Sequence, residues 1–305
     1  AAPILADLPN GRKIVMQVTK QAFVYTFDRE TGEPIWPIEE LPVPAGDVPG
    51  EWYAATQPFP TKPAGFDRQG ITEDDLIDYT PELRAAALEA IEPFRLGTNL
   101  YSPPSVRGAE DGTQGTLSLP SATGGANWEG AALDPETGML YVPSRTVVAV
   151  LSVAKDENSD IDFSMALGVR VPRAMGLPIV KPPYGRITAI DMVEGEHEWM
   201  VANADTPSII ADNPALEGVD LPRTGVETRS GLLLTKTLLF AGEGTGGGPY
   251  LRAHDKQTGE IVAEIEMPGT QTGQPFTYEH NGKQYIAMVV SGQGQPSELV
   301  AYALP

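Results

Sequence analysis

The segment TGGANWEG, at residues 123–130, places an asparagine and a tryptophan side by side among glycines. Asn127 offers a hydrogen-bond donor and an acceptor, and Trp128 offers an indole N–H on a large apolar ring. The flanking glycines let the backbone approach another group closely. Two interpretations are open at this point: a loop that binds a ligand, or a packed tryptophan beside a turn asparagine.

A second candidate is Lys20, in the segment VTKQAFVYTFD at 18–28. The pattern predicts a tight turn between two strands, and a lysine in such a turn is usually solvated. The chemical alternative is an ammonium group that stabilises negative charge on a bound molecule.

Two acidic pairs, Glu39-Glu40 and Asp74-Asp75, are the other groups that bear on catalysis. A carbohydrate-active enzyme would need paired carboxylates of this kind. Both pairs lie where a loop or the start of a helix is expected, however, so a solvated face is the simpler interpretation.

The composition excludes several classes of function. A formal net charge of −20 disfavours nucleic acid and anionic lipid surfaces as partners. The absence of cysteine rules out disulfides, thiolate metal sites and covalent haem attachment in this chain. No apolar run reaches the roughly 18 residues of a membrane-spanning helix. His197, His254 and His280 are scattered without metal-ligand spacing, so surface or turn positions are expected.

One turn signature recurs and must position the candidate residues. Its copies are FDRETG (27–32), LDPETG (133–138), IDMVEG (190–195) and HDKQTG (254–259). Each is expected to close a β-hairpin, because the aspartate accepts backbone N–H groups and the glycine adopts a positive φ. A tryptophan follows the aspartate by eight residues in two copies, at Trp36 and Trp199, whereas Ala263 takes that place in another. These features predict propeller blades with insertions and tryptophans packed between neighbouring sheets.

Strand-rich segments surround these turns, and two insertions interrupt them. Strand pairs are expected at 12–28, 138–153, 231–243 and 283–292. The first insertion, 42–104, contains a helix that is capped by Thr80 and begins at Pro81. The second, 161–184, is predicted to be a loop that covers a surface.

Together these features resemble the C-terminal half of the dehydrogenases that depend on pyrroloquinoline quinone (PQQ), which are eight-bladed β-propellers. The resemblance runs along the whole chain, 1–305, and is greatest to the membrane glucose or polyol dehydrogenase type. It implies an all-β fold that forms one domain and about half of the ring, with a partly helical insertion at 42–104. It is carried by the segments APILADL, TQPFP, TPELR, YSPPS, GGANWEG, GQPFTYEHNGKQYIAMVVSG and VAYALP.

The resemblance also implies roles for single residues. Lys20 falls on the lysine that hydrogen-bonds the quinone oxygens of PQQ, and Asn127 with Trp128 falls on the pair beside the quinone. In this interpretation the glycines allow a flat ligand to approach the backbone. Trp36 and Trp199 are expected to be structural.

Other parts of the site are expected outside this chain. The family's catalytic aspartate lies just upstream of APILADL, and the ligands of its Ca²⁺ or Mg²⁺ belong to the N-terminal half. Asp7 falls on a strand-turn position and does not replace the catalytic aspartate. Glycines in GEGTGGGP, 242–249, stand where glucose-oxidising relatives carry an acidic residue. Glucose specificity is therefore not implied.

The resulting hypothesis is part of a periplasmic PQQ-dependent dehydrogenase that oxidises an alcohol, polyol or sugar. It passes electrons to a quinone or a cytochrome. The resemblance implies no catalytic residue or metal ligand within this chain. The open blade faces are expected to need the N-terminal half of the propeller or a second copy of the chain. The alternative is a non-catalytic PQQ-like repeat propeller that serves as a binding scaffold.

Overall fold

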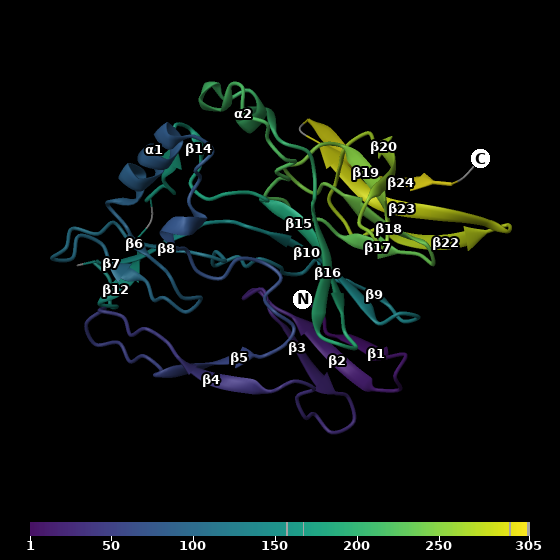
Figure 1. Cartoon of the computed structure of the whole chain (residues 1–305), viewed down its shortest axis with the longest axis horizontal. Coiled ribbons are helices and arrows are strands. Elements are labelled where there is room, and N and C mark those ends of the chain that lie inside the picture. The colour runs from purple at the N-terminus through teal and green to yellow at the C-terminus, as the bar shows by residue number, and fades with distance from the viewer. Residues whose placement is uncertain (157, 167, 293, 304–305) are drawn as a thin grey trace.

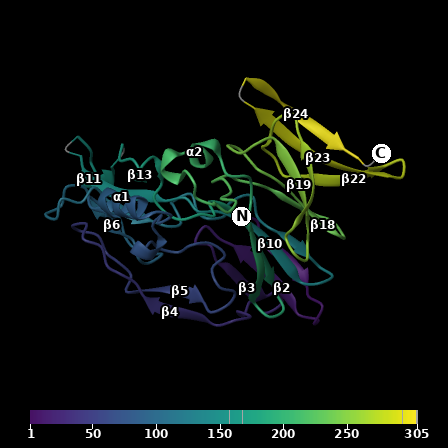
Figure 2. The same ribbon diagram turned by 45° about the horizontal axis from the view of Figure 1, so that its top comes forward.

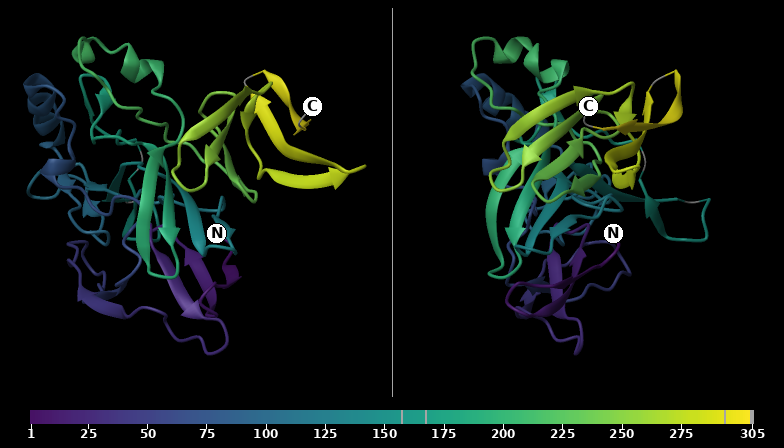
Figure 3. Two further views of the ribbon diagram at one scale, coloured as in Figure 1. Left: turned by 45° about the vertical axis from the view of Figure 1, so that its right-hand side comes forward. Right: turned by 90° about the vertical axis from the view of Figure 1, so that its right-hand side faces the viewer.

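The computed structural model describes residues 1–156, 158–166, 168–292 and 294–303, and it confirms the predicted all-β propeller architecture (Figure 1). Four sheets follow one another in an open arc, from the purple first sheet to the yellow fourth sheet (Figure 3). The first consists of β1 (Ile4–Asp7), β2 (Lys13–Val18) and β3 (Val24–Asp28). The second has the strand order β16-β15-β10-β9 and consists of β9 (Ala132–Asp134), β10 (Met139–Arg145), β15 (Gly185–Asp191) and β16 (Glu196–Ala202).

The third and fourth sheets complete the arc. The third has the order β17-β18-β19-β20 and consists of β17 (Leu232–Leu234), β18 (Leu238–Gly242), β19 (Tyr250–Asp255) and β20 (Ile261–Glu266). In the fourth, β23 (Lys283–Gly292) pairs with β24 (Gln295–Tyr302) along one edge. The other edge of β23 pairs with β21 (Thr270–Gln271) and with β22 (Phe276–His280).

Strand alternation builds the core between the sheets. Successive side chains of a strand point to opposite faces of the sheet. In β10, Leu140 and Val142 therefore pack toward the first sheet, while Tyr141 between them packs toward the third. In the same way Met288 and Val290 of β23 pack against Leu251 of the third sheet. Each interior sheet is thus buried on both faces.

The turn signature forms hairpins as predicted, but its four copies are not equivalent. Asp28, Asp191 and Asp255 each follow the third strand of a sheet. The LDPETG copy instead joins β9 to β10, the first and second strands of the second sheet. The second sheet therefore holds two copies and the fourth holds none. The signature occurs four times and the arc has four sheets, but there is not one copy of the signature in each sheet.

The repeat tryptophans pack between sheets, as predicted. A Cβ atom at Gly195 would stand 2.8 Å from Trp36 Cζ2, and one at Gly259 would stand 2.8 Å from Trp199 Cε3. Each tryptophan thus lies on the glycine of the signature in the next sheet. The indole Nε1 of Trp199 also donates to Lys256 O at 3.3 Å.

The short turns and the long connections lie at opposite ends of the sheets. Because neighbouring strands are antiparallel, all signature turns fall at one end. The β2–β3 turn and the connections β10–β15, β16–β17 and β18–β19 fall at the other end. Lys20, Asn127 and Trp128 are all carried by this second end, which we call the connection end.

The insertions form a separate layer that lies away from the fourth sheet (Figure 2). It contains the helices η1 (Glu73–Asp75), α1 (Pro81–Ile91), α2 (Ser208–Ala211) and η2 (Pro214–Leu216). Its strands are β6 (Arg95–Leu96), β7 (Ser105–Val106), β8 (Thr116–Ser118), β11 (Ala149–Lys155), β12 (Phe163–Met165), β13 (Arg173–Ala174) and β14 (Leu177–Pro178). The hairpin of β4 (Ile38–Pro42) and β5 (Thr56–Pro60) lies instead against the first sheet, where Tyr25 Oη donates to Pro58 O at 2.9 Å. Helix α1 begins as predicted, because Leu83 N donates to Thr80 Oγ1 at 3.2 Å.

Three expectations about segments of the chain were wrong. The segment 283–292 is the single strand β23 and not a strand pair. The segment 138–153 does not form a strand pair, because β10 joins the second sheet whereas β11 pairs with β8 and β12 in the insertion layer. The segment 161–184 is not simply a covering loop, because it supplies β12 to that sheet and forms the β13–β14 hairpin. The segment 138–153 is mostly apolar throughout, so its sequence gave no sign that β10 and β11 belong to different sheets.

Candidate functional site

Lys20 lies in the turn between β2 and β3, with its side chain exposed. Its carbonyl accepts a hydrogen bond from Gly125 N at 3.0 Å. Its Nζ lies 3.5 Å from Ala122 O, at the limit of a hydrogen bond. The ammonium group is therefore held beside the 122–128 loop and has no carboxylate partner among the described residues.

The 122–128 loop rests directly on Lys20. Gly124 has a φ of +85°, and a Cβ atom there would stand 2.6 Å from Lys20 Cβ. Both the backbone conformation and the close contact thus require glycine at this position. The structure brings together residues that are about one third of the chain apart.

Asn127 and Trp128 occupy the end of this loop. Asn127 is half-buried, and its Nδ2 donates to Thr123 O at 3.0 Å, which closes the loop on itself. Trp128 is 50% exposed. Trp128 is therefore not packed in a core within this chain, and its ring is accessible.

Arg145 is a candidate that the sequence interpretation missed. It ends β10, its backbone N donates to Gly125 O at 2.9 Å, and its Nη2 donates to Thr123 Oγ1 at 2.8 Å. No ion pair to Arg145 occurs among the described residues. Burial lowers the pKa of its guanidinium, and the charge of Arg229 lowers it further. A charged residue at the end of an otherwise buried strand is the sequence signal that points to it.

A buried carboxylate supports the loop from below. The Asp67 side chain is 1% exposed, and its Oδ1 accepts hydrogen bonds from Arg68 N and Thr146 Oγ1, each at 2.7 Å. Arg186 Nη2 lies 3.4 Å from the same oxygen. A Cβ atom at Gly125 would stand 3.4 Å from Asp67 Cβ. This network joins the β5–β6 connection at Asp67 to the β10–β15 connection at Thr146, beneath the loop that contains Gly125.

The far end of the loop is tied to the third and fourth sheets. Glu129 is buried, and its Oε1 lies 3.2 Å from Arg229 Nε. Its carbonyl accepts a hydrogen bond from Gln274 Nε2 at 2.6 Å. The loop therefore spans the connection end from the first sheet to the fourth.

The GEGTGGGP turn, between β18 and β19, is built around a buried carboxylate. Glu243 forms an ion pair with the fully buried Arg252 and accepts a hydrogen bond from Gly248 N at 2.5 Å. Arg252 Nη2 also pairs with Asp205 at 2.8 Å. The one acidic residue of this turn is thus committed to holding the turn together.

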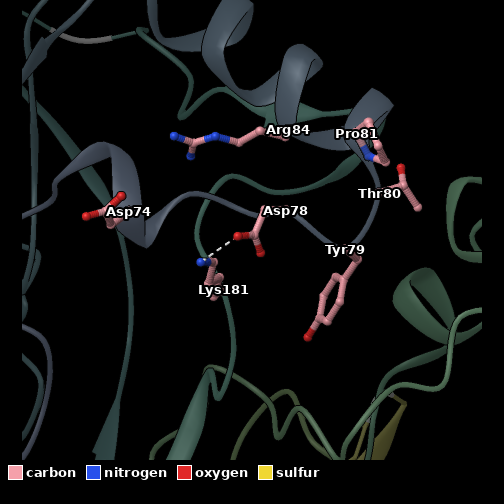
Figure 4. Close-up of a pocket in the computed structure, with 7 residues that line it drawn as sticks. All are labelled: Asp74, Asp78, Tyr79, Thr80, Pro81, Arg84 and Lys181. Carbon is pink, nitrogen blue, oxygen red and sulfur yellow. Dashed lines mark ion pairs between the residues drawn. The ribbon is translucent and has the colours of Figure 1, made fainter.

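A large recess lies elsewhere, between the start of α1 and Lys181 (Figure 4). It has a volume of about 580 Å³. Lys181 points at Asp78, and their charges are paired at 2.7 Å (Figure 4). Lys20, Asn127 and Trp128 do not line it, whereas Asp74 of one acidic pair does. Its Lys181 is already paired with Asp78. We therefore place the candidate site at the 122–128 loop.

Metal ligands do not gather in this part of the protein. Within the described ranges, no group of three or more histidine, aspartate or glutamate side chains is placed to hold a metal ion. His254 is buried rather than at the surface, and its Nδ1 lies 2.8 Å from Gly259 O within a signature turn. The expected surface or turn position was therefore wrong for His254, which is a buried residue of β19 whose side chain bonds a glycine of the adjoining turn.

The sequence has clear relatives. Over residues 1–286 it matches the PQQ family described as the glucose/ethanol/alcohol dehydrogenase β-propeller domain. It is 28% identical to a quinate/shikimate dehydrogenase (quinone) of Acinetobacter baylyi and 28% identical to a quinoprotein glucose dehydrogenase of Escherichia coli. The two alignments cover 99% and 100% of this chain but only 40% of each relative. The chain therefore spans less than half the length of these relatives.

Solved structures agree on the fold. A quinohemoprotein alcohol dehydrogenase from Comamonas testosteroni aligns with a TM-score of 0.53 and 18% identity, over 99% of this chain and 37% of that chain. A europium-containing methanol dehydrogenase aligns with a TM-score of 0.52 and 16% identity, over 95% of this chain and 39% of that chain. At these sequence identities, both structural alignments show similarity of fold alone.

Proposed function

Because this chain belongs to the PQQ β-propeller family of glucose, ethanol and alcohol dehydrogenases, we propose that it is part of a PQQ-dependent dehydrogenase. Its substrate is an alcohol, a polyol or a sugar. The observation that carries the proposal is the packing of Lys20 on Gly124, beside the exposed ring of Trp128. A binding scaffold would not need an unpaired ammonium group and an exposed indole at the same loop.

The residues present fit the cofactor. PQQ is a flat, anionic molecule that takes up two electrons from the alcohol when it is bound. The connection end offers an exposed lysine, a half-exposed tryptophan ring and the guanidinium of Arg145, which has no ion pair among the described residues. In a chain with a net charge of −20, these cations favour an anionic ligand at this end.

Each residue has a distinct task in this proposal. Lys20 donates hydrogen bonds to the quinone oxygens and stabilises negative charge there. Asn127 orients the ligand through its side-chain oxygen, because its Nδ2 already bonds Thr123 O at 3.0 Å. Trp128 provides an apolar edge that excludes water from one side.

The remaining parts of the site lie outside this chain in this proposal. The catalytic aspartate and the ligands of Ca²⁺ or Mg²⁺ come from the N-terminal half of the ring. The 40% coverage of the quinate and glucose dehydrogenases supports this division. The fourth sheet offers a docking face for that half or for a second copy of the chain. Phe276, Tyr278 and Leu299 on this face are 47%, 41% and 66% exposed.

We further propose that electrons pass to a quinone or a cytochrome and that the protein acts in the periplasm. The names of two relatives, a quinate/shikimate dehydrogenase (quinone) and a lupanine 17-hydroxylase [cytochrome c], support acceptors of these classes. Among the described residues, no helix is long and apolar enough to cross a membrane.

Reconstitution tests the proposed function. The full-length protein that contains this chain is loaded with PQQ and Ca²⁺ or Mg²⁺ and is assayed with alcohols, polyols and sugars and an artificial electron acceptor. We expect oxidation that depends on PQQ. The isolated chain should show none, because the base and the metal ligands are absent. A full-length protein that neither binds PQQ nor oxidises any of these substrates would contradict the proposal.

A further inference from the structure

A short segment of the first insertion lies directly beneath the β2–β3 turn. Phe66 N donates to Ala22 O at 2.9 Å, and Gln69 Nε2 donates to Gln21 O at 2.7 Å. The two accepting residues are those that follow Lys20 in the turn. Phe66 is 2% exposed, so its hydrogen bond is shielded from water. The position of the turn therefore depends on a part of the chain that lies outside the propeller sheets.

Ala22 adopts a backbone conformation that requires support from its surroundings. It has a φ of +68° and is fully buried. A residue with a Cβ atom rarely adopts such a φ, and the conformation persists only where neighbouring contacts impose it. Besides the hydrogen bond from Phe66 N, a Cβ atom at Gly125 would stand 3.4 Å from Ala22 Cβ. The turn that carries Lys20 is thus held by the segment below it and by the loop beside it.

Asp67 joins the same segment to the other side of the site. Its Oδ1 accepts a hydrogen bond from Thr146 Oγ1 at 2.7 Å. Thr146 directly follows Arg145, whose N donates to Gly125 O at 2.9 Å. Gly125 N in turn donates to Lys20 O at 3.0 Å. These hydrogen bonds and the chain between them form a closed circuit, which we call the loop circuit, through Lys20, Gly125, Arg145, Thr146, Asp67, Phe66 and Ala22.

Asp67 is buried as an ion, which makes a role in stability alone a poor explanation. Its side chain is 1% exposed, and its Oδ2 has no hydrogen-bond partner among the described residues. The buried Arg186 lies 3.4 Å from Oδ1 and also donates to Thr146 Oγ1 at 2.6 Å. The cost of removing two such charges from water offsets most of their attraction, so apolar residues of the same volume would stabilise the fold as well. A buried ion pair can, however, fix one arrangement of the groups around it. The loop with Gly124 and Gly125 needs such a constraint, because glycine has little conformational preference of its own.

We propose that Asp67 is a positioning residue for the cofactor site. Through the loop circuit it fixes the separation between the turn that carries Lys20 and the 122–128 loop that carries Asn127. It acts through Thr146 and through the β2–β3 turn, and not by contact with PQQ. The inference rests on the proposed function, since it concerns the same site.

The test combines two measurements on the full-length protein that contains this chain. One is the affinity of the apo form for PQQ, and the other is amide hydrogen exchange in the segments 18–24 and 122–128 without PQQ. Thr146→Val opens the loop circuit while it keeps the shape of the side chain. We expect this variant to bind PQQ about tenfold or more weakly and to exchange faster in both segments. Thr146→Ser keeps the hydroxyl group and should retain most of the affinity. Asp67→Ala should change both measurements in the same direction as Thr146→Val.

Thr224→Val is the matched control. Thr224 and Thr146 are both 1% exposed, and the Thr224 hydroxyl donates to Gly225 O at 3.1 Å, outside the loop circuit. The control should lose stability, because it also loses a buried hydrogen bond, but its affinity for PQQ and its exchange in the two segments should match the wild type.

Three results would overturn the inference. The first is a Thr146→Val protein that matches Thr224→Val in both measurements. The second is a Thr146→Ser protein as defective as Thr146→Val. The third is a loss of affinity for PQQ without faster exchange, because the loss would then not arise from positioning. A wild-type protein that does not bind PQQ would contradict the proposed function. Faster exchange in Thr146→Val but not in Thr224→Val would in that case still support the role of Asp67 in ordering the loop.

Discussion

The side chain of Lys20 lies against Gly124, where a Cβ atom would approach Lys20 Cβ to 2.6 Å. The contact joins the β2–β3 turn to the 122–128 loop and places the ammonium group beside Ala122 of that loop, at 3.5 Å from its carbonyl oxygen. Gly124 also adopts a φ of +85°, so it is required both for its conformation and for the space that it leaves.

Gly124→Ala should separate the loop from Lys20. We expect the affinity for PQQ to fall about tenfold or more, because the ammonium and the loop can no longer share their present positions. Gly130→Ala is the control, since Gly130 has a φ of +66° but no atom within 4 Å of an added Cβ. Both variants incur a backbone strain of about 1–2 kcal/mol. Equal affinities for PQQ in the two variants would show that the contact with Lys20 is unimportant.

Trp199→Phe should lower stability without affecting the site. The indole packs on Gly259 and hydrogen-bonds Lys256 O at 3.3 Å, between the second and third sheets. Loss of this packing and of the hydrogen bond should reduce the free energy of unfolding by about 1–3 kcal/mol, as urea denaturation would measure. The affinity for PQQ should not change. A variant that unfolds like the wild type but does not bind PQQ would disprove the structural role.

His254 should make stability depend on pH. Burial lowers its pKa below the ordinary value of 6.5, and its Nε2 has no hydrogen-bond partner among the residues that the structure describes. Above pH 6.5 both the folded and the unfolded states are neutral at this residue. As the pH falls below 6.5, the unfolded state binds a proton that the folded state does not. The free energy of unfolding should therefore decrease by up to about 1.4 kcal/mol per pH unit.

Urea denaturation between pH 7.5 and pH 5 measures this dependence. His254→Gln should have a shallower slope than the wild type, whatever its absolute stability. His280→Gln, at an exposed turn, should keep the wild-type slope. Identical slopes in all three proteins would remove the assigned role of His254.

The exposed face of the fourth sheet should cause the isolated chain to associate. Tyr278 and Tyr285 stack on this face with ring centroids 5.0 Å apart, and Leu299 is 66% exposed. The first sheet differs, because its outer aromatic residues are covered by β5, where Phe59 lies 5.9 Å from Phe23. We expect sedimentation equilibrium at micromolar concentration to detect dimers or larger species.

Leu299→Lys combined with Phe276→Lys should shift the isolated chain toward monomer. Trp52→Ser is the control, because Trp52 is 86% exposed but lies in the β4–β5 connection. A wild-type chain that sediments as a folded monomer would contradict the role of the fourth-sheet face.

Local signals in the sequence predicted local structure well. The Asp and Gly of each signature predicted a hairpin, and Thr80 with Pro81 predicted the start of α1. The signature specifies the conformation of a turn but not which two strands the turn joins, so the LDPETG copy could not be assigned to its place in a sheet. The apolar run 138–153 likewise gave no sign that the chain leaves the second sheet between β10 and β11.

Contacts between distant segments were the part that the sequence could not supply. Lys20 and Asn127 were identified by a family resemblance, and their meeting at one loop depends on the packing of the first two sheets. Arg145 ends β10 and belongs to no common motif with Lys20 or Asn127. Their grouping follows from the tertiary arrangement of the connection end, which no local pattern encodes.

Titration of the apo form of the full-length protein with PQQ tests the assignment of the site most directly. Lys20→Ala and Asn127→Ala should each weaken binding about tenfold or more. Lys236→Ala should have no effect, because Lys236 lies in the exposed β17–β18 turn at the opposite end of the sheets. Equal affinity for PQQ in the wild type, Lys20→Ala and Lys236→Ala would contradict the placement of the cofactor at the 122–128 loop.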